Sequence, residues 1–256
     1  MRFLTLYSGS GGNAAYIESD EAAIIIDAGK SAKRLCMALR EIGSSIKDVD
    51  AIFITHDHSD HTSALEALIK KHKIPIHITE KSAEIFESDR FSELRENIVV
   101  HSPLFEVRVG DLNVRSFVTS HDSKMSVGYR IDVDSGISLG FATDLGYVSE
   151  CVKEALVGCR AVILESNHDI EMLESGPYPA FLKERILSRR GHLSNEDSSL
   201  FAAFLAANGT SDFLLAHLSA ENNTPALALD AFLSAVADSS VRVSIAHPEL
   251  PTEICF

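Results

Sequence analysis

Six short apolar runs, each followed by an aspartate, a glutamate or a histidine, constrain the fold of this chain more than any other feature. In open α/β sheets, ligands bind in the crevice beyond one set of strand ends. The pattern therefore predicts that the six polar side chains converge at one edge of a layered α/β structure. The runs AIIID, AIFITH, SFVTSH, GFATD, AVILE and FLLAH end at Asp27, His56, His121, Asp144, Glu165 and His217.

The apolar runs alternate with segments of helical periodicity, as is typical of mixed α/β layers. Two helix starts are well marked, one by a capping box at Ser194 and Asp197 and one by Thr224 before Pro225. No segment has the composition of a linker, so we expect a single domain over residues 1–256. Strands are predicted over 3–7, 14–18, 23–27, 51–55, 75–79, 112–119, 127–133, 138–143, 161–165, 213–217 and 241–246. Helices are predicted over 32–42, 63–72, 82–88, 150–156, 179–188, 195–207 and 225–237.

Composition excludes several classes of protein. Of the 256 residues, 45% are hydrophobic and 23% are charged, which is typical of a globular protein and not of a disordered chain. The net charge of −14 disfavours tight non-specific binding of nucleic acid through a basic stripe. The four cysteines lie far apart, which indicates free thiols in a reducing compartment. No run reaches the roughly 18 apolar residues of a membrane span. We therefore expect a cytoplasmic protein without a membrane partner.

The segment from Thr55 to His61, THDHSDH, contains three histidines and two aspartates directly after an apolar run. Imidazole nitrogens and carboxylate oxygens are ligands of zinc, manganese and iron. The spacing His-x-His-x-Asp-His can provide two ligands to each of two adjacent ions. The alternative is a polar loop with surface histidines, but three histidines in six residues, together with ligand residues at distant strand ends, favour a metal site.

THDHSDH resembles the metal motif of the metallo-β-lactamase fold, an αββα sandwich of two mixed β-sheets flanked by helices. IIIDAG, SHDSKMSVGYRI, ATDLG and LLAHLSAENNTP resemble the remaining motifs in the same order, so the resemblance covers nearly the whole chain. SGSGGNA, ESNHD and GHLSNEDS are most similar to the YycJ/WalJ branch, bacterial nucleases related to RNase Z and RNase J.

The resemblance implies a ligand set of two divalent ions, zinc or manganese or alternatively iron, and no organic cofactor. Asp144 would bridge the ions, and Asp27 would orient the histidine loop as a carboxylate that fixes imidazole tautomers. Asp60 would serve both as a ligand and in catalysis. One ion would be held by His56, His58 and His121, and the other by Asp60, His61 and His217.

His192 lies two residues before the Ser194 cap, near a helix N-terminus where anions are favoured. In RNase Z relatives a similar Gly-His-Ser segment supplies a histidine that protonates the leaving oxygen, and a departing alkoxide needs such a proton. The alternative is a histidine hydrogen-bonded near a cap. The basic run Lys183 to Arg190 could hold phosphates or form a solvated face. Candidate substrate contacts are His168, Arg189, Arg190 and Asn222.

Together these features predict a metal-dependent phosphodiesterase acting on nucleic acid. The branch resemblance implies a 5′-to-3′ DNA exonuclease in which a metal-bound hydroxide attacks phosphorus. The acidic pI of about 5.2 keeps open a small-molecule hydrolase of the same fold, either a cyclic-phosphate diesterase or a glyoxalase-type thioesterase. A metal-binding regulatory module without catalysis is the third interpretation. The sequence does not indicate the oligomeric state or which metal is used.

Overall fold

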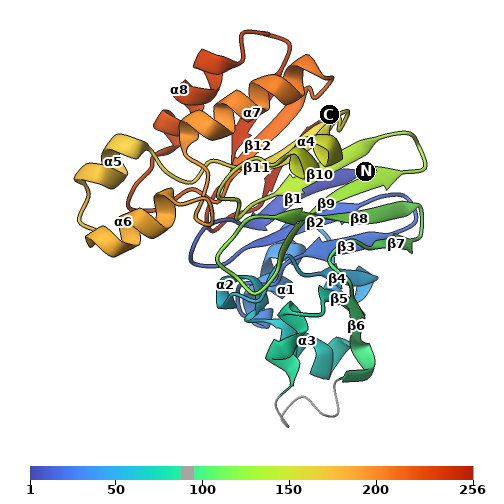
Figure 1. Cartoon of the computed structure of the whole chain (residues 1–256). Coiled ribbons are helices and arrows are strands. Elements are labelled where there is room, and N and C mark those ends of the chain that lie inside the picture. The colour runs from blue at the N-terminus through green and yellow to red at the C-terminus, as the bar shows by residue number, and fades with distance from the viewer. Residues whose placement is uncertain (88–94, 256) are drawn as a thin grey trace.

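Two seven-stranded sheets pack face to face in the computed structural model, which describes residues 1–87 and 95–255 (Figure 1). The first sheet has the order β14 (Thr252–Glu253), β1 (Arg2–Tyr7), β2 (Ala14–Glu18), β3 (Ala23–Ile26), β4 (Ala51–Phe53), β5 (Ile76–Thr79) and β6 (Ile98–His101). The second has the order β13 (Arg242–Ile245), β12 (Asp212–Ala216), β11 (Ala161–Glu165), β10 (Ser138–Ala142), β9 (Ser126–Val133), β8 (Leu112–Thr119) and β7 (Glu106–Val109).

Helices cover the outer face of each sheet. On the first sheet, α1 (Ala32–Glu41) and α3 (Leu65–His72) bury their apolar sides in a shared core with the strands. On the second sheet, α4 (Glu150–Leu156), α7 (Asn195–Ala207) and α8 (Pro225–Ala235) do the same. This arrangement confirms the expected αββα sandwich. The remaining helices are α2 (Ser59–Thr62), α5 (Ile170–Ser175), α6 (Ala180–Leu187) and the 3₁₀ turns Ile46–Asp48 and Ser82–Phe86.

The strands near the middle of each sheet are apolar on both sides because both sides are buried. In β3, Ile25 packs in the core under α1 and α3, whereas Ile24 and Ile26 pack between the two sheets. In β12, Phe213 faces the helices of the second sheet and Leu214 faces the first sheet. Successive side chains point to opposite faces of a strand, so near-continuous apolar runs are needed here.

Strand direction explains why the polar ends of the apolar runs meet. Strands β10, β11 and β12 are parallel, and β8 runs in the same direction because it is antiparallel to β9, which is antiparallel to β10. Their carboxyl ends therefore lie at one edge of the second sheet. In the first sheet, β3 and β4 are likewise parallel.

The structure differs from the predicted elements mainly at the edges. Strands β6 and β7 were not predicted, because each is an edge strand with partly exposed residues instead of an apolar run. Strand β14 has only two residues, and α5 is a short helix after Asp169 that was also missed. The predicted helix 82–88 is a 3₁₀ turn that ends at Phe86, and its last residue lies outside the described residues.

The structure also agrees with two of the more detailed sequence predictions, a hairpin turn and two helix caps. The glycine-rich segment after Tyr7 joins β1 and β2, which pair antiparallel as a hairpin. The hydroxyls of Ser194 and Thr224 cap α7 and α8 by accepting from the backbone N–H groups of Asp197 and Leu227. Within the described part of the chain, no helix has the length and apolar character that a membrane crossing requires.

Candidate metal centre

The loop after β4 folds back on itself because its second half is helical. His58 has extended backbone angles at the start of α2, and the backbone N–H of His61 donates to the carbonyl of His58 at 3.0 Å. The helix expected from residue 63 is therefore preceded by a separate turn. This turn directs Asp60 and His61 back toward the strand end that carries His56, with rings of His56 and His61 4.2 Å apart.

Asp27, at the end of β3, holds this loop from inside the core. Its carboxylate is fully buried and accepts from the backbone N–H of Thr55 at 2.8 Å, from the Thr55 hydroxyl, and from Nδ1 of His61 at 2.8 Å. A donating Nδ1 leaves the lone pair of His61 on Nε2, where the side-chain amide of Asn13 also approaches at 3.0 Å. Asp27 thus fixes both the loop and the tautomer of one ring.

The first group of candidate ligands is His56, His58 and His121, whose ring nitrogens lie within 4.8 Å of one another. The ring of His121 is 5.0 Å from His56 and 5.1 Å from His58 between centroids. Nδ1 of His121 donates to the carbonyl of Gly191 at 3.1 Å, so its Nε2 is free to bind. This group joins the loop after β4 to the end of β8 and could hold one metal ion.

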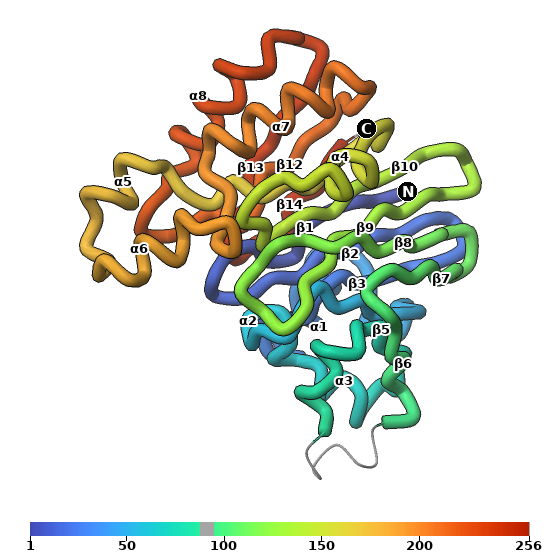
Figure 2. The backbone as a smooth tube through the Cα atoms, in the orientation of Figure 1, coloured from blue at the N-terminus to red at the C-terminus, as the bar shows by residue number. Residues whose placement is uncertain are grey.

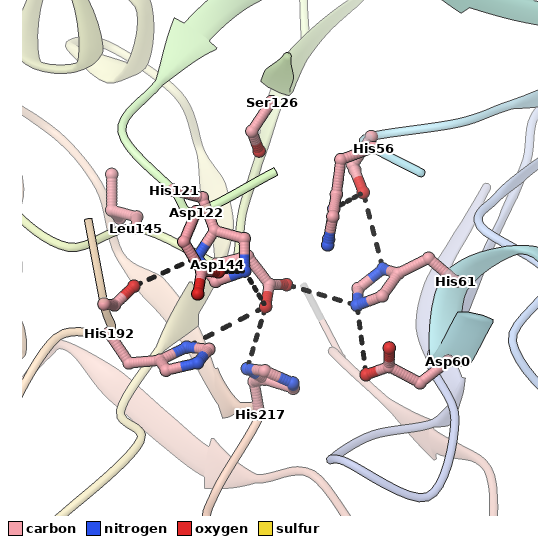
Figure 3. Close-up of polar contacts among 12 residues, drawn as sticks. His56, Asp60, His61, His121, Asp122, Ser126, Asp144, Leu145, His192 and His217 are labelled. Carbon is pink, nitrogen blue, oxygen red and sulfur yellow. Dashed lines mark hydrogen bonds and ion pairs between the residues drawn. The ribbon is translucent and has the colours of Figure 1, made fainter. Parts of the chain in front are cut away.

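The second group is Asp60, His61 and His217, which also gather within 4.8 Å. Asp144 lies between the two groups, and Figure 3 shows the surrounding imidazoles directed at its carboxylate. Asp144 oxygens are 3.4 Å from Nε2 of His61 and 3.5 Å from Nδ1 of His217. Asp144 also belongs to two further candidate groups, one with His56 and His61 and the other with Glu165, His192 and His217.

Glu165, the last residue of β11, orients two rings. It is fully buried, and one oxygen accepts from Nδ1 of His192 and from Nδ1 of His217, each at 2.8 Å. Its other oxygen accepts from the backbone N–H groups of Leu145 and Leu193. Burial opposes its ionisation, but the neighbouring imidazoles His192 and His217 lower the pKa of Glu165 to about 2.

Three of the strand-end residues have left-handed backbone conformations. The φ angles are +63° at Asp27, +56° at Asp144 and +57° at His217. Residues other than glycine rarely adopt this region, although aspartate and histidine do so more often than most. Such conformations persist where the surrounding structure enforces them and are concentrated at functional sites. They turn each side chain out of the sheet at the point where its strand ends.

The donor set fits divalent cations. In the described chain, Nε2 of His56, Nε2 of His217 and one oxygen of Asp144 are buried without a hydrogen-bond partner, which is costly unless another group binds there. Burial disfavours charge on His217, but Asp144 and Glu165 outweigh it and raise the pKa of His217 to about 9. The site therefore attracts positive charge, as a nitrogen and oxygen site for zinc, manganese or iron would.

Five of the seven candidate ligands line an open cavity of about 320 Å³, whereas His56 and His61 are fully buried and are not part of its lining. His192 also lines this cavity, with 20% of its side chain exposed. Its ring centroid lies 4.9 Å from that of His121 and 5.2 Å from that of His217. A histidine at this place, held by Glu165 through Nδ1, can exchange a proton with a bound molecule through Nε2.

The four predicted substrate contacts lie outside the lining of this cavity. His168 is 1% exposed and neither ring nitrogen has a hydrogen-bond partner. Arg189 stacks on the ring of Tyr147, 3.8 Å from its centroid, and Arg190 donates to the carbonyls of His121 and Ser123. Asn222 is fully buried, and its amide contacts the Ser219 hydroxyl. The lining instead includes Asp122, Asn167, Tyr178, Leu182, Arg185 and Ile186.

Two residues of the centre had weak sequence signals. Asn13 contacts Nε2 of His61 at 3.0 Å and follows the glycine-rich turn after β1, which the sequence indicated only as a hairpin. The sequence indicated Glu165 as a strand-end residue able to bind or orient a metal, but gave it no partner. The run AVILE is apolar up to a single carboxylate, and an unpaired buried glutamate is costly, so that signal was available.

Comparison with known proteins places the chain in a family. A family model described as a beta-lactamase superfamily domain matches residues 23–218. A Bacillus anthracis protein named exodeoxyribonuclease YycJ is 36% identical over 267 residues, which covers 100% of this chain and 99% of the relative. A Streptococcus pneumoniae protein named exodeoxyribonuclease WalJ is 35% identical over 248 residues, covering 95% and 91%. The crystal structure of the metallo-beta-lactamase fold protein YhfI from Bacillus subtilis superposes with a TM-score of 0.70 at 16% identity, covering 99% and 100% of the two chains.

Proposed function

This chain belongs to the beta-lactamase superfamily and is a metal-dependent hydrolase, and on that premise we propose that it is a two-metal DNA exonuclease acting 5′ to 3′. The names of the two relatives support DNA as the substrate. The observation that carries the two-metal part is the pair of three-residue ligand groups on either side of one buried carboxylate, Asp144.

In this proposal Asp144 would help to hold both ions. One ion is assigned to His56, His58 and His121, and the other to Asp60, His61 and His217. Two divalent cations, when bound, activate water at neutral pH and neutralise charge on the phosphate oxygens. Asp27 and Glu165 hold the tautomers of His61 and His217, so Nε2 of each ring would be available to hold a cation.

His192 is the proposed proton donor to the leaving oxygen. Glu165 accepts from its Nδ1, which fixes the orientation of the ring and leaves Nε2 as the atom for proton transfer. Asp60 takes part both as a ligand and through its contact of 3.5 Å with Nε2 of His61. Bound cations would give this chain, with its overall charge of −14, a local positive centre for a polyanionic substrate.

The test is a digestion time course on DNA labelled at the 5′ or the 3′ end, with bound metal counted by mass spectrometry. We expect about two ions per chain and early release of 5′ label as short product. The substitutions His58→Ala and Asp144→Asn should each lower the rate of DNA digestion by more than 100-fold, because loss of a residue that only positions a ligand typically costs about 10–100-fold. His72→Ala, at the end of α3 and away from the cavity, is the matched control. Turnover of a thioester or a cyclic phosphate without DNA degradation would overturn the nuclease assignment.

A further inference from the structure

The chain between Glu165 and His192 leaves the second sheet and forms α5 and α6 before it returns. Figure 2 shows this pair standing out beside the rest of the molecule. Helix α6 has no buried residue, which is unusual for a helix of a packed layer. Short helices are marginal in isolation, so most of their stability comes from packing of an apolar side. Packing in the core therefore does not explain why α6 contains apolar residues.

Part of that apolar surface faces the catalytic cavity. Tyr178, which lies just before α6, and Leu182 and Ile186 of α6 all line the cavity. Leu182 and Ile186 are four residues apart and therefore share one side of the helix. Phe181, one residue before Leu182, lies outside the cavity lining and is 71% exposed. The cavity thus has a floor of metal-binding residues and one apolar wall.

A phosphodiester group needs only the polar floor. A half-exposed wall with an aromatic ring fits a flat, largely apolar part of the substrate, and in DNA that part is the base. Base–aromatic stacking is largely independent of sequence because every base has a π-face. The cavity volume of about 320 Å³ is at the lower end for ligand pockets, which suits one nucleotide and not a longer segment.

We propose that Tyr178, Leu182 and Ile186 form a nucleobase subsite that seats the base next to the scissile phosphate. This inference rests on the proposed nuclease function. Arg185 of α6 is paired with Asp122, which follows β8, and both residues line the cavity. That pair ties α6 to the second sheet beside the cavity and places a guanidinium, a group suited to binding phosphate, in the cavity lining.

The subsite implies that the terminal base must leave its partner before cleavage. Unpairing a base costs a few kcal/mol, least for a base that is mismatched or already single-stranded. The enzyme should therefore degrade single-stranded or frayed ends faster than paired G·C ends. An abasic residue at the end should be a poor substrate although its phosphate is intact.

The kinetic test compares an oligonucleotide that ends in a normal nucleotide with one that ends in an abasic residue. For the wild type we expect KM to rise roughly tenfold on the abasic end, the size of one lost stacking contact. Tyr178→Ala and Leu182→Ala should raise KM on the normal end by a similar factor and remove the difference between the two substrates. Phe181→Ala is the matched control, because it removes a large apolar side chain from the same helix outside the cavity.

A binding measurement separates the subsite from catalysis. The metal-free protein in chelator is titrated with an oligonucleotide carrying 2-aminopurine at its 5′ end, and stacking on Tyr178 should quench the fluorescence. Tyr178→Phe should retain quenching and Tyr178→Ala should lose it. Partly exposed positions tolerate these changes, and thermal unfolding checks that each variant is folded.

The outcomes distinguish the two proposals. If the wild type degrades DNA but treats normal and abasic ends alike, the subsite is wrong and the nuclease function stands. If Tyr178→Ala behaves like Phe181→Ala in both assays, the subsite is also wrong. If the wild type does not degrade DNA, the proposed function fails and the subsite fails with it.

Discussion

At the scale of single residues, three buried carboxylates account for the orientation of the histidines. Asp27 accepts from Nδ1 of His61 and Glu165 from Nδ1 of His217, and Asp144 lies 3.4 Å from Nε2 of His61 and 3.5 Å from Nδ1 of His217. Neutral imidazole can bind a metal through only one nitrogen while the other donates. The polar network in the core therefore specifies which atom of each ring faces the cavity.

Asp27→Asn should weaken metal binding by about 10–100-fold, the range for residues that orient ligands. Asparagine has one oxygen for the three donors that Asp27 serves, and its amide N–H₂ would face the N–H of Thr55 or of His61. Asparagine also tolerates positive φ, so the fold should survive. A chelator competition measures the affinity, with Asp20→Asn in an exposed turn as the control. An unchanged dissociation constant would remove the orienting role.

At the scale of elements, β4, β5 and β6 are joined by a column of stacked rings. His77 of β5 stacks on Phe53 of β4 with centroids 4.7 Å apart, and on His101 of β6 at 5.1 Å. His101 in turn stacks on Phe105 at 4.2 Å, in the connection to the second sheet. Burial, together with the nearby His101, lowers the pKa of His77 to about 4. This edge of the first sheet requires neutral histidine.

His77→Phe should reduce the acid sensitivity of folding. The pKa of His77 in the folded state, about 4, is below the ordinary 6.5, so the unfolded chain binds more protons between these values. The free energy of unfolding should therefore fall as pH drops from 6.5 to 4 and be unaffected above 6.5. Phenylalanine can stack on Phe53 and does not titrate. The free energy of unfolding of His77→Phe should therefore change less with pH than that of the wild type. Urea unfolding at several pH values tests this, with His247→Gln at an exposed site as the control. The same pH dependence of the unfolding free energy in His77→Phe and the wild type would contradict the prediction.

At the scale of the whole molecule, the centre belongs to both sheets. His56, Asp60 and His61 come from the loop after β4 of the first sheet, and His121 and His217 follow β8 and β12 of the second. Each group of three candidate ligands contains residues from both. Bound cations would therefore link the two halves of the sandwich as well as serve the reaction.

Metal binding should raise the thermal stability of the protein. A ligand that binds only the folded state stabilises it by about 4 kcal/mol at 1,000 times its dissociation constant. For a chain of this size that corresponds to roughly 10 °C in Tm. Differential scanning calorimetry with manganese, followed by chelator, should show the rise and its reversal, and Asp144→Asn should show a smaller one. A Tm that is independent of manganese would argue against a centre between the sheets.

Much of the fold and the candidate centre could be predicted because their signals are local. Runs such as AVILE and FLLAH are apolar because both faces of their strands are buried. The His-x-His-x-Asp-His motif places four candidate ligands within six consecutive residues. Residues that act at long range were harder to assign. The sequence indicated the chemical type of Arg189 and Asn222, but not that their side chains would lie outside the cavity.

The sequence by itself determined a mixed α/β layer structure, the strand ends that carry the candidate ligands and the helix caps, because periodicity and residue type are properties of neighbouring residues, and the αββα class followed from the family resemblance. Only the tertiary structure decided that β8, β10, β11 and β12 run in one direction and that Glu165 serves two histidines. It alone placed Tyr178 and Leu182 over the centre. Those facts depend on contacts between residues far apart in the chain, and a local pattern contains no information about which distant partner a strand or a side chain will meet.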